Sequence, residues 1–180
     1  MCGILGVLNF DNKKLNKELI IQMRDTMYHR GPDGAGIYLN GSMALGHRRL
    51  AIIDLSETGH QPMSNEDKTI FIVFNGEIYN YIELREELKK KGHKFHSASD
   101  TEVIIHQYEE DGEGCLEKFN GMFSFVLWDS RKKNLFAARD RFGIKPLYYY
   151  LDDKKIIFAS EIKAIIEDPN IKRIPNYQAI

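Results

Sequence analysis

The fold of this chain is constrained most strongly by its apolar, β-branched and aromatic segments, which short turns join in pairs. Residues 36–47, 122–140 and 146–161 each have the pattern of two strands around a tight turn. The first turn is Asn40-Gly41, the most common pair of residues in a two-residue hairpin. Because such hairpins join neighbouring antiparallel strands, the pattern predicts sheets that are largely antiparallel.

Helical patterns occur separately from these strand pairs. They are expected over 15–27, 80–91, 99–112 and 160–167. Asn80 with Glu83, and Ser99 with Glu102, have the spacing of capping boxes. The three glycines of segment 30–36 predict a flexible loop. Since helices and strands do not alternate strictly, the sequence predicts an α+β fold.

The composition excludes several classes of function. The 180 residues include 26 acidic and 25 basic ones, so we expect neither a nucleic-acid nor a membrane partner. The apolar start is too short for a membrane span and lacks the basic region of a signal peptide. Cys2 and Cys115 are the only cysteines, which excludes a disulfide framework and indicates a cytoplasmic protein of one domain.

Motifs for cofactors are absent from the sequence. It contains neither Gly-x-x-x-x-Gly-Lys-Ser/Thr nor Gly-x-Gly-x-x-Gly, the common phosphate-binding patterns. The six histidines show no metal-ligand spacing, and His29 and His47 are expected to hold loops together. We therefore expect no cofactor and no metal site in this chain.

Cys2 is the first candidate catalytic residue. It follows the initiator methionine, which aminopeptidases remove when a small residue comes next. Cys2 would then carry a free α-amine, with an ordinary pKa of about 7.7–8.0, beside a thiol with an ordinary pKa of about 8.5. One residue would supply both the nucleophile and its base. Taken alone, Cys2 also fits a small buried side chain in a strand over 2–9.

Four further residues complete a possible site for hydrolysis of an amide. Asn75 and Gly76 follow an apolar strand and would offer a side-chain amide and an unhindered backbone N–H to an oxyanion. Arg49 would bind a carboxylate, and Asp100 would balance a substrate ammonium group. Each residue also has a structural interpretation: a tight turn, a surface or ion-paired arginine, and a helix-capping acid. Together with Cys2, they indicate an enzyme that hydrolyses the amide of an amino acid.

Seven segments in order carry a resemblance to a known family. They resemble the N-terminal glutaminase domain of glutamine-hydrolysing asparagine synthetases, a class II glutamine amidotransferase of the N-terminal-nucleophile hydrolase superfamily. The resemblance extends from Cys2 to about Ile166. The segments are MCGILG, RGPDGAG, LGHRRLAIIDLS, GHQPM, FNGEIYN, SDTEV and GMFSFVLWDSRKKNLFAARDRFGIKPLYY.

The resemblance implies an αββα sandwich, in which two antiparallel sheets lie between layers of helices. It implies that Cys2 is the N-terminal nucleophile. It also implies that the Asn75 side chain and the Gly76 N–H form the oxyanion hole.

Substrate binding is also implied by the resemblance. Arg49 would hold the α-carboxylate of L-glutamine, and Glu77 and Asp100 would hold its α-ammonium group. The segment from Leu50 to Ile53 would line the site, and the backbone of Ile53 would contact the substrate.

Members of this family have a second half that the sequence lacks, an ATP-pyrophosphatase domain with a Ser-Gly-Gly-x-Asp-Ser phosphate loop. We expect an amidotransferase domain over 1–168 and the start of a linker to a synthetase domain over 169–180. The chain would be excised from a longer protein, as its tail without stop signals favours, or would work with a separate synthetase. ATP and magnesium are expected only in that synthetase domain.

The expected substrate is L-glutamine, the expected partner is the synthetase domain, and a homodimer is a further expectation. Three alternatives stay open. They are the same glutaminase with a different ammonia acceptor, a non-catalytic domain of this fold, and a self-processing peptidase or amidase. The intact site residues argue against the second, and the single methionine before Cys2 is too short a propeptide for the third.

Overall fold

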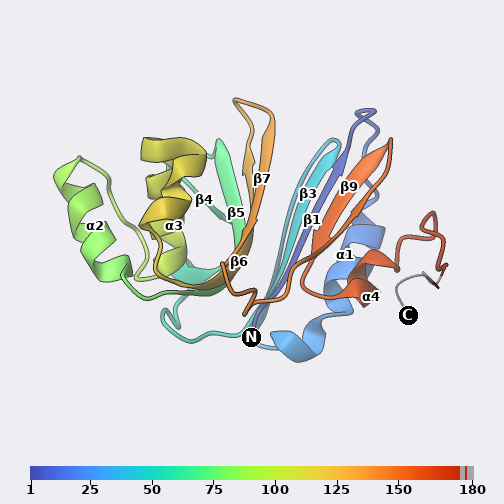
Figure 1. The fold of residues 1–180 in the computed structure, drawn as a ribbon, viewed down its shortest axis with the longest axis horizontal. Coiled ribbons are helices and arrows are strands. Elements are labelled where there is room, and N and C mark those ends of the chain that lie inside the picture. The colour runs from blue at the N-terminus through green and yellow to red at the C-terminus, as the bar shows by residue number, and fades with distance from the viewer. Residues whose placement is uncertain (175–176, 178–180) are drawn as a thin grey trace.

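Two antiparallel sheets form the centre of the molecule (Figure 1). The computed structural model describes residues 1–174 and 177. The strand order is β2-β3-β1-β9-β8 in the five-stranded sheet and β4-β5-β6-β7 in the four-stranded sheet. The strands are β1 Gly3–Asn9, β2 Gly34–Asn40, β3 Met43–Arg49, β4 Met63–Ser64, β5 Ile70–Ile78, β6 Gly121–Asp129, β7 Asn134–Arg139, β8 Tyr148–Leu151 and β9 Lys155–Ala159. The α-helices are α1 Lys17–Asp25, α2 Tyr81–Lys90, α3 Asp100–Asp111 and α4 Ile162–Ile165, and the 3₁₀ helices are Tyr28–Arg30, Glu57–Gly59 and Gly112–Lys118.

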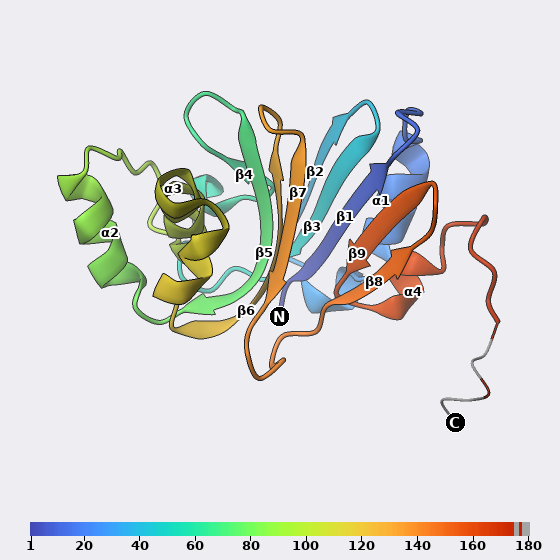
Figure 2. The same cartoon turned by 45° about the horizontal axis from the view of Figure 1, so that its top comes forward.

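The sheets pack face to face, and helices cover both outer faces (Figure 2). Helices α2 and α3 cover the four-stranded sheet, and α1 and α4 cover the five-stranded sheet. Strand β1 is buried on both sides: Ile4 faces the other sheet, whereas Leu5 faces the helices. This double burial explains the continuous apolar run near the start of the chain. The architecture is the expected αββα sandwich.

The predicted hairpins are confirmed. Strands β2 and β3, β6 and β7, and β8 and β9 pair as antiparallel neighbours. At the first turn, Gly41 has a φ of 59°, a conformation that favours glycine.

The prediction that a strand ends at Asn75-Gly76 is wrong. Strand β5 continues to Ile78, and Gly76 pairs with Phe123 of β6. A Cβ atom on Gly76 would lie 2.7 Å from the Phe123 Cα, so glycine is required here by the close approach of the neighbouring strand. The ladder between β5 and β6 outweighs the local preference of Asn-Gly for a turn.

The flexible loop predicted over 30–36 is also not observed as such. Strand β2 begins at Gly34, and none of the three glycines has a positive φ. A Cβ atom on Gly36 would collide with the Gln61 carbonyl oxygen. The glycines therefore permit close packing of backbone rather than mobility.

The helix starts only partly follow the predicted capping. The Ser99 hydroxyl accepts a hydrogen bond from the Thr101 N–H at 3.1 Å, as expected. Glu102, however, accepts from the N–H groups of the preceding segment rather than from Ser99. The Asn80 side chain does not cap α2, because its oxygen accepts from the Asn120 N–H at 3.0 Å. Both departures connect a helix to a neighbouring segment.

The two histidines expected to hold loops differ in their surroundings. His29 lies 2.9 Å from the Glu161 carboxylate and connects the chain after α1 to the start of α4. His47 lies inside β3, fully buried, and its Nε2 is 3.2 Å from the Phe74 carbonyl oxygen of β5. Burial lowers the pKa of His47 to about 3, so the neutral ring donates a hydrogen bond from one sheet to the other.

None of the helices in the described part of the chain has the length and hydrophobicity that a membrane span requires.

Gly6→Ala tests the contact between the sheets. An alanine Cβ would lie 2.7 Å from the Val126 Cγ1 across the interface, so the Val126 side chain or the strands that carry it would have to shift. We expect the free energy of unfolding to fall by about 1–3 kcal/mol in urea titrations. Gly114→Ala is the control, because its nearest atom would be 3.9 Å away. Equal effects of the two changes would contradict this view of the interface.

Candidate active site

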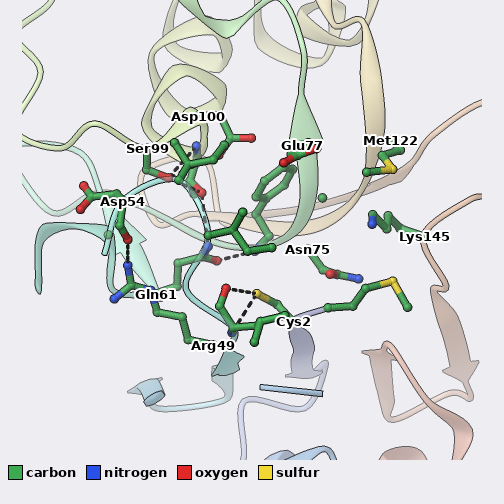
Figure 3. A pocket seen from close by; sticks show the side chains of 18 residues that line it. Cys2, Arg49, Asp54, Gln61, Asn75, Glu77, Ser99, Asp100, Met122 and Lys145 are labelled. Atoms are coloured by element: carbon green, nitrogen blue, oxygen red, sulfur yellow. Dashed lines mark hydrogen bonds between the residues drawn. The ribbon is translucent and has the colours of Figure 1, made fainter. Parts of the chain in front are cut away.

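A cavity lies where the first residues of the chain meet the ends of β3 and β5 and the start of α3 (Figure 3). Its walls thus come from both sheets and from a helix. All the site residues predicted from the sequence line it: Cys2, Arg49, Leu50, Ile53, Asn75, Gly76, Glu77 and Asp100.

Cys2 is held in this cavity by backbone contacts. Its Sγ accepts from the Leu50 N–H at 3.4 Å and lies 3.6 Å from the Leu50 carbonyl oxygen. The Arg30 Nε donates to the Cys2 carbonyl at 2.9 Å, which fixes the backbone beside the sulfur. These contacts hold the Cys2 thiol at the wall of the cavity, which Met1 also lines.

Burial raises the pKa of the Cys2 thiol. The Leu50 N–H and the positive charges of Arg49 and Arg30 act in the opposite direction without cancelling the effect of burial. The thiol is thus the favoured form, and formation of a thiolate requires a base.

Asn75 faces the same cavity from β5. Its side chain is 2% exposed, yet the amide Nδ2 has no hydrogen-bond partner among residues 1–174 and 177. Leaving a buried donor without an acceptor costs about 1–3 kcal/mol. A partnerless donor at a cavity wall is suited to an oxygen atom of a ligand.

Arg49 is buried, and its guanidinium donates to the carbonyl oxygens of Ser56, at 3.0 Å, and of Asp54. No carboxylate in the described chain forms an ion pair with it. Arg48, its neighbour on the opposite strand face, instead pairs with Asp25 at 2.8 Å. The Arg49 charge is therefore available to an anionic group in the cavity.

Asp100 and Glu77 supply negative charge to the cavity. The buried Asp100 carboxylate accepts a hydrogen bond from the Ile78 N–H at 2.9 Å. Burial raises the pKa of Asp100 to about 6, and the nearby charge of Glu77 acts in the same direction. Neither carboxylate forms an ion pair within the part of the chain that the structure covers. In Figure 3 they lie on the side of the cavity opposite to Cys2 and Arg49.

Asp54 organises the loop that carries Leu50 and Ile53. Its carboxylate accepts from the Ser56 hydroxyl at 2.6 Å and N–H at 2.9 Å, and from the Ala98 N–H at 3.0 Å. These hydrogen bonds, those of Ser56 first, lower the pKa of Asp54 to about 2. The loop is thereby attached to the segment before α3, and the Ile53 side chain lies at the rim, 37% exposed.

Several residues of the cavity wall were not predicted from the sequence, among them Gln61 and Lys145. The Gln61 Oε1 accepts from the Phe74 N–H at 2.6 Å, and its Nε2 donates to the Thr101 hydroxyl at 3.2 Å. Gln61 therefore joins β5 to the start of α3 beside Asn75. Gln61 belongs to the GHQPM segment, but no local pattern marks either residue, because only the tertiary structure brings them to the site.

A family model described as "Glutamine amidotransferase domain" matches residues 1–180. The chain belongs to this family. The amidotransferase domain is 44% identical over 175 residues to asparagine synthetase (glutamine-hydrolyzing) 3 of Bacillus subtilis (strain 168), which covers 96% of this chain and 28% of that protein. It is 49% identical over 170 residues to asparagine synthetase (glutamine-hydrolyzing) 2 of Arabidopsis thaliana, which covers 93% and 29%.

The amidotransferase domain spans less than two-fifths of the length of these relatives. The same holds for the putative asparagine synthetase (glutamine-hydrolyzing) 2 of Methanocaldococcus jannaschii, with 44% identity over 98% of this chain and 37% of that protein. Among solved structures, glutamine phosphoribosylpyrophosphate amidotransferase from B. subtilis superposes with a TM-score of 0.77 at 21% identity, over 91% of this chain and 43% of that one. This likeness shows that the chain shares the fold of that amidotransferase.

Asp100→Asn tests the electrostatics of the cavity. The carboxyl group ionises near pH 3.8 in the unfolded chain and near 6 in the folded domain. The folded state binds more protons between these values, so the free energy of unfolding falls as the pH rises through this window. Asparagine keeps an oxygen for the Ile78 N–H but has no charge to bury.

We expect the variant to exceed the wild type in free energy of unfolding at pH 8, by on the order of 2–3 kcal/mol. The difference should shrink towards pH 4.5 in denaturant titrations. A difference that is the same at both pH values would show that ionisation of Asp100 is not costly in the folded domain.

Proposed function

We propose that this domain is the glutaminase half of an asparagine synthetase-like amidotransferase. It hydrolyses the side-chain amide of L-glutamine to glutamate and ammonia through a thioester on Cys2. The observation that supports this most strongly is that the Cys2 thiol and the partnerless Asn75 amide line one cavity. The same cavity contains Arg49, Asp100 and Glu77, charges of both signs that form no ion pair with any described residue. Such charges suit the binding of a free amino acid.

In this proposal, the α-carboxylate of glutamine binds Arg49, and its α-ammonium group binds Asp100 and Glu77. Leu50 and Ile53 contact the substrate from the loop after β3. Fixing both charged groups presents the side-chain amide to Cys2 and supplies the proximity term of catalysis. Asparagine is one methylene shorter, so its amide would not reach the sulfur and would be a poor substrate.

The first chemical step requires removal of Met1. The freed α-amine of Cys2, directly or through a water molecule, accepts the proton of the thiol, whose pKa burial raises. The sulfur attacks the amide carbon of glutamine, and the C=O electron pair moves to the oxygen. The resulting oxyanion accepts hydrogen bonds from the Asn75 Nδ2 and the Gly76 N–H.

Ammonia is released next, and the thioester is then hydrolysed. The tetrahedral intermediate collapses, the C–N bond breaks, and the nitrogen takes a proton from the α-ammonium of Cys2 and leaves as ammonia. Water then attacks the γ-glutamyl thioester, with the α-amine as its base. The S–C bond breaks, the thiol is restored and glutamate is released.

The ammonia is used by a synthetase partner, in the same or a separate chain, that activates aspartate with ATP and magnesium. The names and greater length of the asparagine synthetases that match this chain support such a partner. We assign 1–168 to the amidotransferase domain and 169–180 to the start of a connection to the synthetase. This reaction would take place in the cytoplasm, without a cofactor in this chain.

Cys2→Ala is expected to abolish release of glutamate from glutamine, because the thioester cannot form. Glutamate release is measured together with the circular dichroism spectrum, which should not change. Cys115→Ala is the matched control, since Cys115 is buried away from the cavity and burial raises its pKa to about 12. Intact mass measurement should show that active wild-type protein lacks Met1. Substantial turnover by Cys2→Ala would reject the nucleophile.

Asn75→Ala is expected to lower kcat by about 10²–10³-fold, because the oxyanion loses one donor. KM for glutamine should change by only a few-fold, since neither charged group of the substrate contacts this residue. Steady-state kinetics on protein without Met1 provides both constants. If KM and kcat deteriorate to the same extent, Asn75 binds the ground state and does not act as an oxyanion donor.

A further inference from the structure

A second cluster of polar side chains lies on α3, outside the cavity described above. It contains His93, which follows α2, and His106 and Glu109 of α3. The His93 Nδ1 is 3.2 Å from the His106 Nδ1. The Glu109 Oε2 is 2.8 Å from the His106 Nδ1 and 3.6 Å from the His93 Nδ1. Three ligand atoms of the kinds that bind transition metals therefore converge.

These separations are close to those between the ligand atoms of a tetrahedral metal ion. Zinc binds histidine nitrogen and carboxylate oxygen at about 2.0–2.2 Å, so the ligand atoms of a tetrahedral site lie about 3.3–3.5 Å apart. The three distances of the cluster fall on both sides of this value, and small movements of the side chains would equalise them.

The second ring nitrogen of each histidine faces a carboxylate. The His93 Nε2 is 3.0 Å from the Glu110 Oε1. The His106 Nε2 is 3.9 Å from the Glu102 Oε1 and has no hydrogen-bond partner in the described residues, although the side chain is 1% exposed. The Glu110 carboxylate is within hydrogen-bond distance of His93, and a carboxylate in this position orients a metal-binding histidine and strengthens it as a ligand. The Glu102 carboxylate lies near His106 but beyond hydrogen-bond distance.

Glu109 is oriented in the same manner. Its other oxygen, Oε1, accepts a hydrogen bond from the Asn65 Nδ2 at 2.8 Å, which directs Oε2 to the two histidines. The Glu109 side chain is 23% exposed and that of His93 is 16% exposed, so an ion and a water ligand can enter from solvent.

We propose that His93, His106 and Glu109 bind one zinc ion, with water as the fourth ligand. The ion would attach the segment after α2 to α3, and so stabilise the connection that leads to Asp100. Sequence spacing does not reveal this site, because thirteen positions separate the two histidines in the chain and α3 positions only one of them.

Negative charge surrounds this position. The carboxylates of Glu102, Glu109 and Glu110 each lie 3.9 Å or less from a ring nitrogen of His93 or His106. A divalent cation bound here would offset part of this charge.

Isothermal titration of chelator-treated chain with zinc chloride tests the proposal. We expect one zinc per chain, a higher melting temperature with zinc, and the visible absorption of a tetrahedral site when cobalt replaces zinc. Cys2→Ala should bind zinc equally well, which separates this site from the catalytic thiol and from any failure of the glutaminase function.

Variants locate the site. His93→Gln and Glu109→Gln should each weaken zinc binding by more than about 100-fold, and Glu110→Gln by about 10–100-fold through loss of the outer carboxylate. His96→Gln is the control, because its side chain is 70% exposed and its ring lies outside the three-ligand cluster. Circular dichroism checks that each variant is folded. The proposal is overturned if the wild type binds no zinc at micromolar concentrations, or if binding survives in His93→Gln and Glu109→Gln.

Discussion

Direct packing of one sheet against the other is the constraint on which the rest of the molecule depends. Gly6 has no side chain at the point where Val126 approaches, and the buried His47 donates a hydrogen bond across the interface to the Phe74 carbonyl. These contacts fix β1 and β3 relative to β5. Because Cys2 precedes β1 and Asn75 follows Phe74, the same contacts also determine where the thiol lies relative to the partnerless amide.

The cavity that results contains charge without compensation. Burying Arg49 and Asp100 without an ion-pair partner among the described residues lowers stability, and the rest of the fold must offset that cost. Hydrogen bonds with backbone groups keep both side chains in place: Arg49 donates to the Ser56 carbonyl oxygen, and Asp100 accepts from the Ile78 N–H. In the proposed reaction, a zwitterionic substrate would neutralise these charges on binding. In that proposal, the lower stability of the empty domain is the cost of a site that binds an amino acid.

Local sequence patterns correctly predicted those elements that depend only on residues adjacent in the chain. The Asn40-Gly41 turn and the end of α3 at Gly112 follow from backbone preferences of adjacent residues, and both are confirmed. Asn75-Gly76 has the same local preference as Asn40-Gly41, but pairing with β6 keeps it extended. The expected site residues do share one cavity. The position of Gln61 and the approach of His93 to His106 could not be predicted, because each brings together residues of different elements.

The attachment of α3 to β5 has a consequence for the length of ligand that the cavity accepts. Asp100 is anchored to the Ile78 N–H, three residues along the same strand from Asn75. An extended strand advances about 3.3 Å per residue, so the two positions are about 10 Å apart and cannot approach one another without breaking the ladder with β6. The rigid geometry of the strand would then determine which of two side chains that differ by one carbon is accepted. Motion of the surrounding loops would not change this selection.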